Sequence, residues 1–231
     1  MLASLEDAKV LAGGQSLIPL LNFRLARPQH VVDINRIEGL DRIYGRDGGI
    51  AVQALARQAA VEDSTVAANI CPLLTDAIRL VAHRVIRNRG TVCGSIAHAD
   101  PASELPAVML VLGGHVLARS VRGERLIAAE QLFKGVFETA LEPDELLVEA
   151  WFPEVVDRRA IIEESRRHGD FALAGVVRAG GNLALFGVAP TPVLADPQNP
   201  TAGLQPSGDL EATPEFRLHL VRELTKRAFA A

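Results

Sequence analysis

Residues 9–19 read KVLAGGQSLIP, and this stretch decides how the N-terminal part of the chain folds. Val10 and Leu11 are typical of the end of a buried strand. Gly13 and Gly14 follow, and a glycine pair lets the backbone turn sharply and approach a ligand because two Cβ atoms are missing. Successive N–H groups in such a turn can form a nest for an anion. The pair also fits a plain strand-to-helix turn, and it matches neither glycine-rich phosphate fingerprint.

A second glycine-containing stretch lies at residues 86–106, IRNRGTVCGSIAHADPASELP. It again places glycines close to small hydroxyl residues, which are Gly90, Thr91, Gly94 and Ser95. Two carboxylates follow, Asp100 and Glu104, and such residues also serve as caps and charge partners at a helix N-terminus. Two loops of similar composition make a phosphate site a stronger hypothesis than either loop alone.

The two stretches resemble the flavoprotein, or medium, subunit of the molybdenum hydroxylases, the family of carbon monoxide dehydrogenase and xanthine dehydrogenase. AGGQSLIP (12–19) is similar to the first FAD-pyrophosphate loop of that family, and TVCGS (91–95) to the second. The resemblance continues in the family's order through NFRLARPQHVVDI (22–34), RNRGT (87–91), AHADPASELP (97–106), SRRHGDFALAG (165–175) and GVAPTPV (187–193). It therefore covers most of the chain.

The resemblance implies an α+β fold, in agreement with the mixed order of helix and strand patterns. We expect an FAD-binding domain of the two-subdomain vanillyl-alcohol-oxidase (PCMH) type at residues 1–153. A small α+β domain like that of carbon monoxide dehydrogenase flavoproteins should follow at residues 154–231. Against the family pattern both domains are expected to be shortened, the first ahead of its first loop and the second around Ala179–Gly181 and after Pro192.

The resemblance also implies which residues hold FAD. One half of the pyrophosphate cradle would come from Leu11, Ala12, Gly13, Gly14, Gln15, Ser16 and Leu17. The other half would come from Thr91, Val92, Cys93, Gly94 and Ser95. Asp100 or Glu104 would bond the ribityl or ring end of the flavin, and Leu147 matches a position whose backbone contacts it. Since Gln15 lies where some related flavoproteins attach flavin through a histidine, we expect non-covalent FAD.

Two features near the second loop have open interpretations. Cys93 replaces a glycine of the family's Thr-x-Gly-Gly pattern, so its side chain either moves the phosphate away or points into the core; we expect a packed core residue. Arg84, Arg87 and Arg89 end a predicted helix. Their charge either complements the helix dipole or faces a pyrophosphate or a partner chain.

Composition and charge exclude other classes of function. The 231 residues carry a net charge of −4, so nothing global indicates nucleic acid. No apolar run reaches the ~20 residues of a membrane span, and no signal peptide is evident, so we expect a cytoplasmic protein. Cys71 and Cys93 are too few to ligate an iron–sulfur cluster. His98 and Asp100 lack further ligands at a spacing that would bind a metal.

Hydrophobic periodicity and turn residues predict the other elements. We expect helices over 55–68, from Pro72 to about Ile86, up to Leu112, and from Pro214 after an N-cap at Thr213. Strands are expected at 28–34, 40–44, 50–53, 116–121, 125–128, 146–152, 172–177 and 182–188.

These observations predict an FAD-binding electron-transfer subunit of a heteromeric molybdenum hydroxylase. By resemblance, molybdopterin would lie in a large subunit and two-iron two-sulfur clusters in a small subunit. Electrons would pass from the clusters through FAD to an external acceptor, and the complex would be a dimer of heterotrimers. Two alternatives stay open. A free-standing FAD-dependent oxidase or reductase of the same fold would need its own acid or base beside the flavin, and an interaction subunit would have lost FAD.

Overall fold

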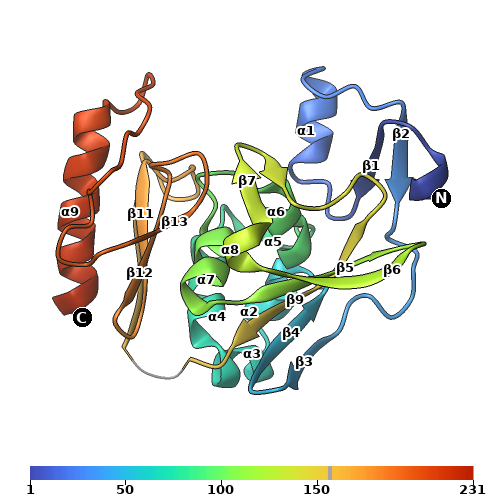
Figure 1. Cartoon of the computed structure of the whole chain (residues 1–231), viewed down its shortest axis with the longest axis horizontal. Coiled ribbons are helices and arrows are strands. Elements are labelled where there is room, and N and C mark those ends of the chain that lie inside the picture. The colour runs from blue at the N-terminus through green and yellow to red at the C-terminus, as the bar shows by residue number, and fades with distance from the viewer. Residues whose placement is uncertain (156–157, 231) are drawn as a thin grey trace.

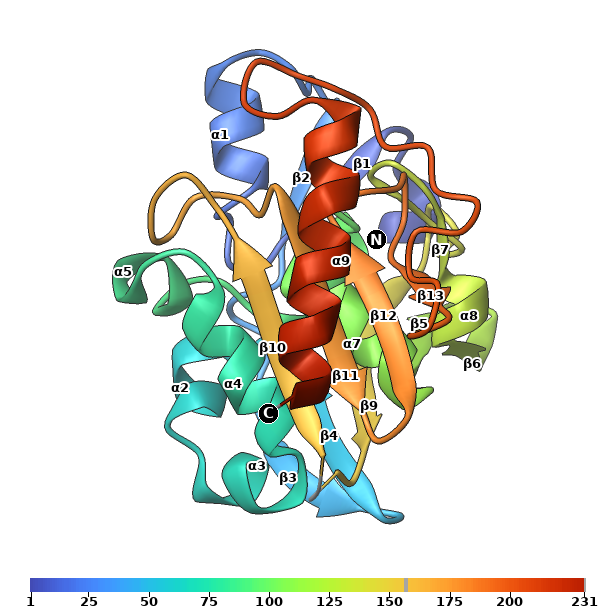
Figure 2. The ribbon, with the colours of Figure 1, turned by 90° about the vertical axis from the view of Figure 1, so that its left-hand side faces the viewer.

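The computed structural model describes residues 1–155 and 158–230. They form alternating layers, as Figure 1 and Figure 2 show. Helix α9 (Pro214–Ala230) covers one face of a four-stranded sheet, short helices fill the space behind that sheet, and a five-stranded sheet closes the far side. The predicted α+β class is confirmed.

The first strand and the first loop belong to a small unit at the N-terminal end (Figure 1). The unit begins with the short 3-10 turn η1 (Leu2–Ser4). Strand β1 (Ala8–Leu11) follows and pairs in parallel with β2 (His30–Asp33), and helix α1 (Leu17–Asn22) connects the two strands. A separate small core around Ile34, Ala54 and Leu55 joins this pair to the rest of the chain. The predicted strand ahead of the first loop and the strand within 28–34 are both present.

The five-stranded sheet has the order β3-β4-β9-β5-β6, and all its pairs are antiparallel. Its strands are β3 (Ile43–Arg46), β4 (Gly49–Gln53), β5 (His115–Ser120), β6 (Gly123–Ala128) and β9 (Leu146–Pro153). The predicted hairpin about GRDGG is present, with Asp47 and Gly48 at positive φ in its turn. Alternation along each strand directs one set of side chains toward the helices.

In the helical layer two predicted helices differ from the prediction, and some of the short helices were not predicted. The layer consists of α2 (Gln58–Glu62), α3 (Thr65–Ile70), α4 (Pro72–Leu80), α5 (Arg84–Arg87), α6 (Val92–His98), α7 (Glu104–Leu112) and α8 (Ala129–Leu132). The helix expected over 55–68 is two helices, because the Ser64 hydroxyl accepts the N–H of Ala67 and starts α3 anew.

The helix predicted from Pro72 to Ile86 also ends early, at Leu80. Ala82 has a positive φ of 43°, and the Arg87 guanidinium donates to the freed carbonyls of Val81 (2.9 Å) and Ala82 (3.2 Å). Val85 continues the apolar spacing in the sequence but is 74% exposed. The apolar spacing therefore predicted a buried helix face only as far as Leu80, where α4 ends.

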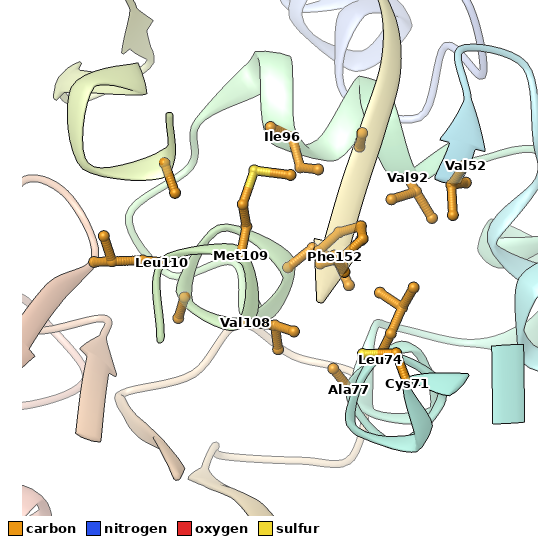
Figure 3. Close-up of a cluster of buried hydrophobic side chains, with 14 of the residues drawn as sticks. Val52, Cys71, Leu74, Ala77, Val92, Ile96, Val108, Met109, Leu110 and Phe152 are labelled. Carbon is orange, nitrogen blue, oxygen red and sulfur yellow. The ribbon is translucent and has the colours of Figure 1, made fainter. Parts of the chain in front are cut away.

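The main core lies between the five-stranded sheet and the helices (Figure 3). Phe152 of β9 is fully buried among side chains that include Leu74 of α4, Ile96 of α6 and Met109 of α7. Burying a large apolar side chain stabilises a fold by about 1.5–3 kcal/mol. This core fixes the start of α6, which carries the second glycine loop.

The C-terminal layer is a meander of β10 (Arg159–Glu164), β11 (Ala174–Ala179), β12 (Asn182–Phe186) and β13 (Val193–Ala195), covered by α9. Thr213 caps α9 by accepting the N–H of Phe216 at 3.2 Å, as predicted. Strands β10 and β13 were not predicted, nor was the small pair β7 (Phe133–Gly135) and β8 (Glu138–Thr139). The side chains of β10 are half-buried on both faces, so its residues show no clear alternation.

Candidate functional site

The first glycine loop connects β1 to α1 and turns through Gly14, which has a φ of 75°. A Cβ at Gly14 would also lie 3.1 Å from side-chain atoms of Leu11 and Ile18. Gln15 donates from its amide to the carbonyl of Gly13 at 3.2 Å. Ser16 is the exposed N-cap of α1, and its hydroxyl makes no capping hydrogen bond there. The Ser16 hydroxyl is therefore available to a ligand.

The two glycine loops, far apart in the sequence, touch each other. A Cβ at Gly13 would lie 2.4 Å from the carbonyl oxygen of Arg89 and 2.8 Å from the Cα of Gly90. Both are backbone atoms, so neither can move as the end of a flexible side chain could. Gly13 therefore has a third role that the sequence did not suggest, since it lets the first loop pack directly on the second.

A hollow of about 320 Å³ opens beside this contact. It is lined by Leu11, Gly13, Gly14, Gln15, Ile18, Pro19 and Arg89. A hollow with glycine backbone on one side and a cation on the other is suited to an anionic group. The structure thus brings residues of the first loop together with the residue that precedes the second.

The three arginines before the second loop have different surroundings. Arg84 pairs with Asp63, and Arg87 is buried against Glu62 at 2.9 Å. Arg89 is exposed, and its guanidinium makes no hydrogen bond or ion pair with any residue that the structure describes. Internal pairing explains the first two arginines, and only the third faces the hollow.

The second loop is the start of helix α6 rather than a free turn. Thr91 is 2% exposed, and its hydroxyl accepts the N–H of Gly94 at 3.0 Å as the N-cap. A Cβ at Gly94 would lie 2.6 Å from that hydroxyl oxygen, so glycine keeps the cap intact. Ser95 shares a hydrogen bond of 2.9 Å with Ser103, the N-cap of α7.

Cys93 points away from the loop surface and into the main core. It is 2% exposed, and its thiol lies 3.3 Å from the carbonyl oxygen of Val52 in β4. Burial raises the pKa of the Cys93 thiol far above its ordinary value, so the sulfur stays protonated. The expectation of a packed core residue is confirmed, and Val92 beside it is fully buried as well.

The two predicted carboxylates have unequal environments. Asp100 accepts the N–H of Ala102 at 2.9 Å and so closes its own turn instead of capping α7. Glu104 is buried in the first turn of α7. Burial, with the nearby carboxylates of Glu163 and Asp100, raises the pKa of Glu104 to about 8.

Glu163 of β10 is a half-buried carboxylate near Glu104 that the sequence did not single out. One of its oxygens is buried without a hydrogen-bond partner among the described residues. Burial raises its pKa to about 7. In the sequence Glu163 is followed by Glu164 at the end of an unpredicted strand, and two adjacent glutamates are typical of a solvated surface. Carboxylates with an oxygen that has no protein partner would accept hydrogen bonds from ligand hydroxyls.

Leu147 lies elsewhere, in β9 of the five-stranded sheet. Its side chain is buried in the main core, and its backbone is in register with Ala118 of β5. Leu147 does not line the hollow. Two residues outside every predicted motif lie closer to the loops: Asn35 donates to the carbonyl of Ala12 in the first loop, and Arg57 donates to the carbonyl of Arg89 ahead of the second.

Other kinds of site have little support in the described part of the chain. His98 stacks on Phe137, with ring centroids 4.9 Å apart, instead of facing further ligands. Across residues 1–155 and 158–230, no cluster of three or more His, Cys, Asp or Glu side chains could hold a metal ion. In the same residues, no helix has the length and apolar character needed to cross a membrane.

The sequence is similar to those of known proteins over nearly the whole chain. The chain is 37% identical to the 6-hydroxypseudooxynicotine dehydrogenase complex subunit alpha of Paenarthrobacter nicotinovorans, covering 97% of the chain and 86% of that protein. It is 32% identical to the carbon monoxide dehydrogenase medium chain of Hydrogenophaga pseudoflava, covering 98% and 89%.

Solved structures agree. A chain of carbon monoxide dehydrogenase from Hydrogenophaga pseudoflava superposes with a TM-score of 0.93 at 32% identity, covering 100% of this chain and 91% of that one. A chain of quinoline 2-oxidoreductase from Pseudomonas putida 86 gives 0.92 at 32% identity, covering 99% and 90%. The model of the FAD-binding domain in molybdopterin dehydrogenases matches residues 1–155. The chain therefore belongs to the family of FAD-binding subunits of molybdopterin dehydrogenases.

Proposed function

We propose that this chain binds FAD non-covalently across its two glycine loops and serves as the medium subunit of a molybdenum hydroxylase. The observation that carries the proposal is the direct contact of Gly13 with Arg89 and Gly90 beside a hollow. That contact gives the two loops of the family pattern a single shared surface. A dinucleotide with two phosphates is the kind of ligand that such a surface fits.

The residues present fit FAD. For the pyrophosphate we assign the loop backbones and their flanks, Leu11, Ala12, Gly13, Gly14, Gln15, Ser16, Leu17, Thr91, Val92, Cys93, Gly94 and Ser95. Val92 and Cys93 would contribute backbone only, because both side chains are buried. Glu104, with Asp100 nearby, would accept hydrogen bonds from the ribityl hydroxyls, and Leu147 would offer its backbone.

FAD, when bound, supplies the electron exchange, and the chain's own residues position it. The loops would hold the phosphates, and the exposed Arg89 guanidinium would balance their charge. A buried Glu104 with a raised pKa can keep a proton at its carboxyl and both give and accept hydrogen bonds. No acid or base acting on an organic substrate is required of this chain.

The holoenzyme's substrate is decided elsewhere in the complex. Relatives of this chain carry names that include nicotine, caffeine and carbon monoxide, which are chemically unlike one another. Similar chains thus serve enzymes with different substrates. We therefore assign this chain the transfer of electrons from iron–sulfur clusters through FAD to an external acceptor.

For partners we propose an iron–sulfur small subunit and a molybdopterin-binding large subunit, in a cytoplasmic dimer of heterotrimers. The names of relatives support a multi-chain enzyme, since they are called medium chain, medium subunit or complex subunit. The surface of α1 supports it too, because that helix has no buried residue, and Phe23 and Leu25 beside it are 77% and 76% exposed. Exposed apolar groups of this kind mark interaction surfaces.

We further propose that residues 1–153 form the FAD-binding domain and residues 154–231 the C-terminal domain. The strand order supports this division, since the four-stranded sheet and α9 use only residues after the boundary. The two parts share one core, in which Phe186 and Val177 pack with helices of the first part. The C-terminal part would thus act as a fixed wall beside Glu104.

Purification of the full chain alone tests the assignment. We expect a yellow protein with about one FAD per chain, seen in the flavin absorbance bands, and no turnover of organic substrates. A yellow protein that oxidises an organic substrate by itself would favour the free-standing oxidase or reductase. A colourless protein that gains no flavin on incubation with FAD would favour an interaction subunit that has lost the cofactor.

A further inference from the structure

We propose that Asn35 and Arg57 are positioning residues, which hold the two glycine loops at the separation that FAD needs. The inference rests on the proposed function because FAD is its ligand. Neither residue belongs to a glycine loop or to any motif in the sequence. Both are placed by their hydrogen bonds, which form a continuous connection from one loop to the other.

The connection runs through three hydrogen bonds. The Asn35 amide donates to the carbonyl of Ala12 in the first loop at 2.8 Å. The Arg57 guanidinium donates through one nitrogen to the amide oxygen of Asn35 at 2.6 Å. Its other terminal nitrogen donates to the carbonyl of Arg89, ahead of the second loop, at 2.7 Å. The planar guanidinium can make both bonds at once because its donors point in fixed directions.

Asn35 is itself held in one orientation. Asp33, the last residue of β2, accepts from the Asn35 amide nitrogen at 2.6 Å and from the Asn35 backbone N–H at 2.9 Å. These bonds fix which end of the amide faces Arg57, and they lower the pKa of Asp33. The first loop is thus tied to a side chain whose rotation is blocked.

Arg57 approaches the second loop with its backbone as well. It is paired with Thr91 in an isolated antiparallel bridge, and the next N–H, of Gln58, donates to the carbonyl of Gly90 at 2.8 Å. The segment from Arg89 to Thr91 is therefore held by the guanidinium and by the chain that carries it. Rigid support of this kind is what a binding site needs when its donors must lie within about 0.5 Å of their best positions.

The charges around the connection favour a bound anion. Burial and the nearby charge of Arg89 lower the pKa of Arg57, while the carboxylate of Asp33 acts in the opposite direction. Asp33 also senses the charge of Arg89, so one carboxylate lies near two guanidinium groups at the junction of the loops. A pyrophosphate beside Arg89 would add the negative charge that balances the second guanidinium.

Replacement of Arg57 by methionine in the full chain tests the inference. Methionine keeps much of the length of the side chain and removes both bonds to the loops. The FAD dissociation constant, measured by flavin fluorescence, is expected to rise by roughly tenfold or more. The control is Arg125→Met, since Arg125 also donates to a backbone carbonyl, that of Ala140 at 2.7 Å, and pairs with Glu145, but lies in β6 away from the loops.

Two further variants separate positioning from charge and from general stability. Arg57→Lys keeps the charge but loses the pair of guanidinium donors, so its FAD affinity should lie between those of Arg57→Met and the unaltered chain. An affinity equal to that of the unaltered chain would overturn the positioning role. Asn35→Ala should weaken FAD, and the double variant Asn35→Ala/Arg57→Met should be little weaker than the worse single variant, because both break one connection. Independent, multiplying effects would contradict the proposal.

The outcomes distinguish this inference from the proposed function. If the unaltered chain binds FAD and Arg57→Met binds it equally well, the positioning role is wrong and the proposed function stands. If the unaltered chain fails to bind FAD, the proposed function fails and this inference fails with it. Each variant without FAD should unfold cooperatively at a temperature no lower than that of the Arg125→Met control, which loses an ion pair as well, and this result rules out a loss of fold as the cause.

Discussion

The two glycine loops have similar compositions but are built in different ways. The first lies on a two-stranded unit with a small core, and its side chains at Gln15 and Ser16 are half-buried or exposed. The second is the capped start of α6, with Thr91 and Cys93 buried in or against the main core. One loop is shaped by backbone conformation, and the other by packing.

This difference separates binding from stability. Substitutions in the first loop should change the affinity for FAD with little effect on folding, because few core contacts are lost. Substitutions in the second loop should change the free energy of unfolding, because its side chains face the interior. Gly13 is the point where the two loops meet, so it should combine a large effect on binding with a modest one on stability.

The largest effect is expected for Gly13→Val. The new side chain would collide with the carbonyl of Arg89 and push the loops apart. We expect the FAD affinity to fall by roughly 100-fold, which corresponds to about 2.8 kcal/mol. Flavin absorbance of the purified protein measures this. The control Gly181→Val has open space around its Cβ and should keep its flavin, and full flavin content in Gly13→Val would contradict the assignment of the first loop.

A smaller effect is expected for Arg89→Gln. The variant removes the one charge of the arginine trio that faces the hollow. FAD affinity should fall by about tenfold at low salt and by less at high salt, because salt screens exposed charges. Titration at two ionic strengths measures this. Arg84→Gln, from the same trio but paired with Asp63, should bind FAD normally, and equal effects in the two variants would remove the special role of Arg89.

A pH-dependent effect on stability is expected at Glu163, the half-buried carboxylate near Glu104. The pKa of Glu163 is raised to about 7 in the fold, above its ordinary value of about 4.5 when unfolded. Below pH 4.5 both states hold the proton; between about pH 4.5 and 7 only the unfolded state loses it, so stability falls across this range and stays at the lower level above pH 7.

Glu163→Gln should therefore raise the melting temperature more at pH 8.5 than at pH 5.5, by roughly 2–4 °C for each kcal/mol gained. Thermal unfolding of the FAD-free chain at both values checks this. The exposed Glu164→Gln is the matched control, and it should show no such dependence. An equal shift at both pH values would mean that Glu163 is solvated.

The smallest effect on binding is expected for Cys93→Ala. The thiol faces Val52 on the side away from the loop surface, so FAD affinity should stay within about twofold. The lost core contact should lower the free energy of unfolding by about 1 kcal/mol. Chemical denaturation and a flavin titration measure the two quantities. A tenfold loss of affinity at unchanged stability would show that the sulfur supports the ligand directly.

The sequence predicted elements that turn residues and caps define locally. Glycines and prolines marked β1, the GRDGG hairpin and the start of α9, and each is present. The break at Ala82 could not be predicted, because it depends on the Arg87 guanidinium reaching back to two carbonyls. The spacing of apolar residues and turn residues gives no information about such a contact between a side chain and the backbone.

The same limit applies to the site. The two loops could be recognised because each carries its own glycine pattern, but their contact at Gly13 depends on the tertiary fold. Asn35 and Arg57 are single polar residues without a motif, and only their hydrogen bonds connect them to the loops. Glu163 looks like a surface residue until β10 turns it inward.

The central claim is that this chain is the FAD-binding subunit of a molybdenum enzyme, and one measurement tests it most directly. The complex that contains the chain should be purified from its own host, and its native mass and its content of FAD, iron and molybdenum determined. We predict a large assembly that holds all three, with a cysteine-rich small subunit and a large subunit beside this chain. A monodisperse flavoprotein without iron or molybdenum that turns over an organic substrate would contradict the claim.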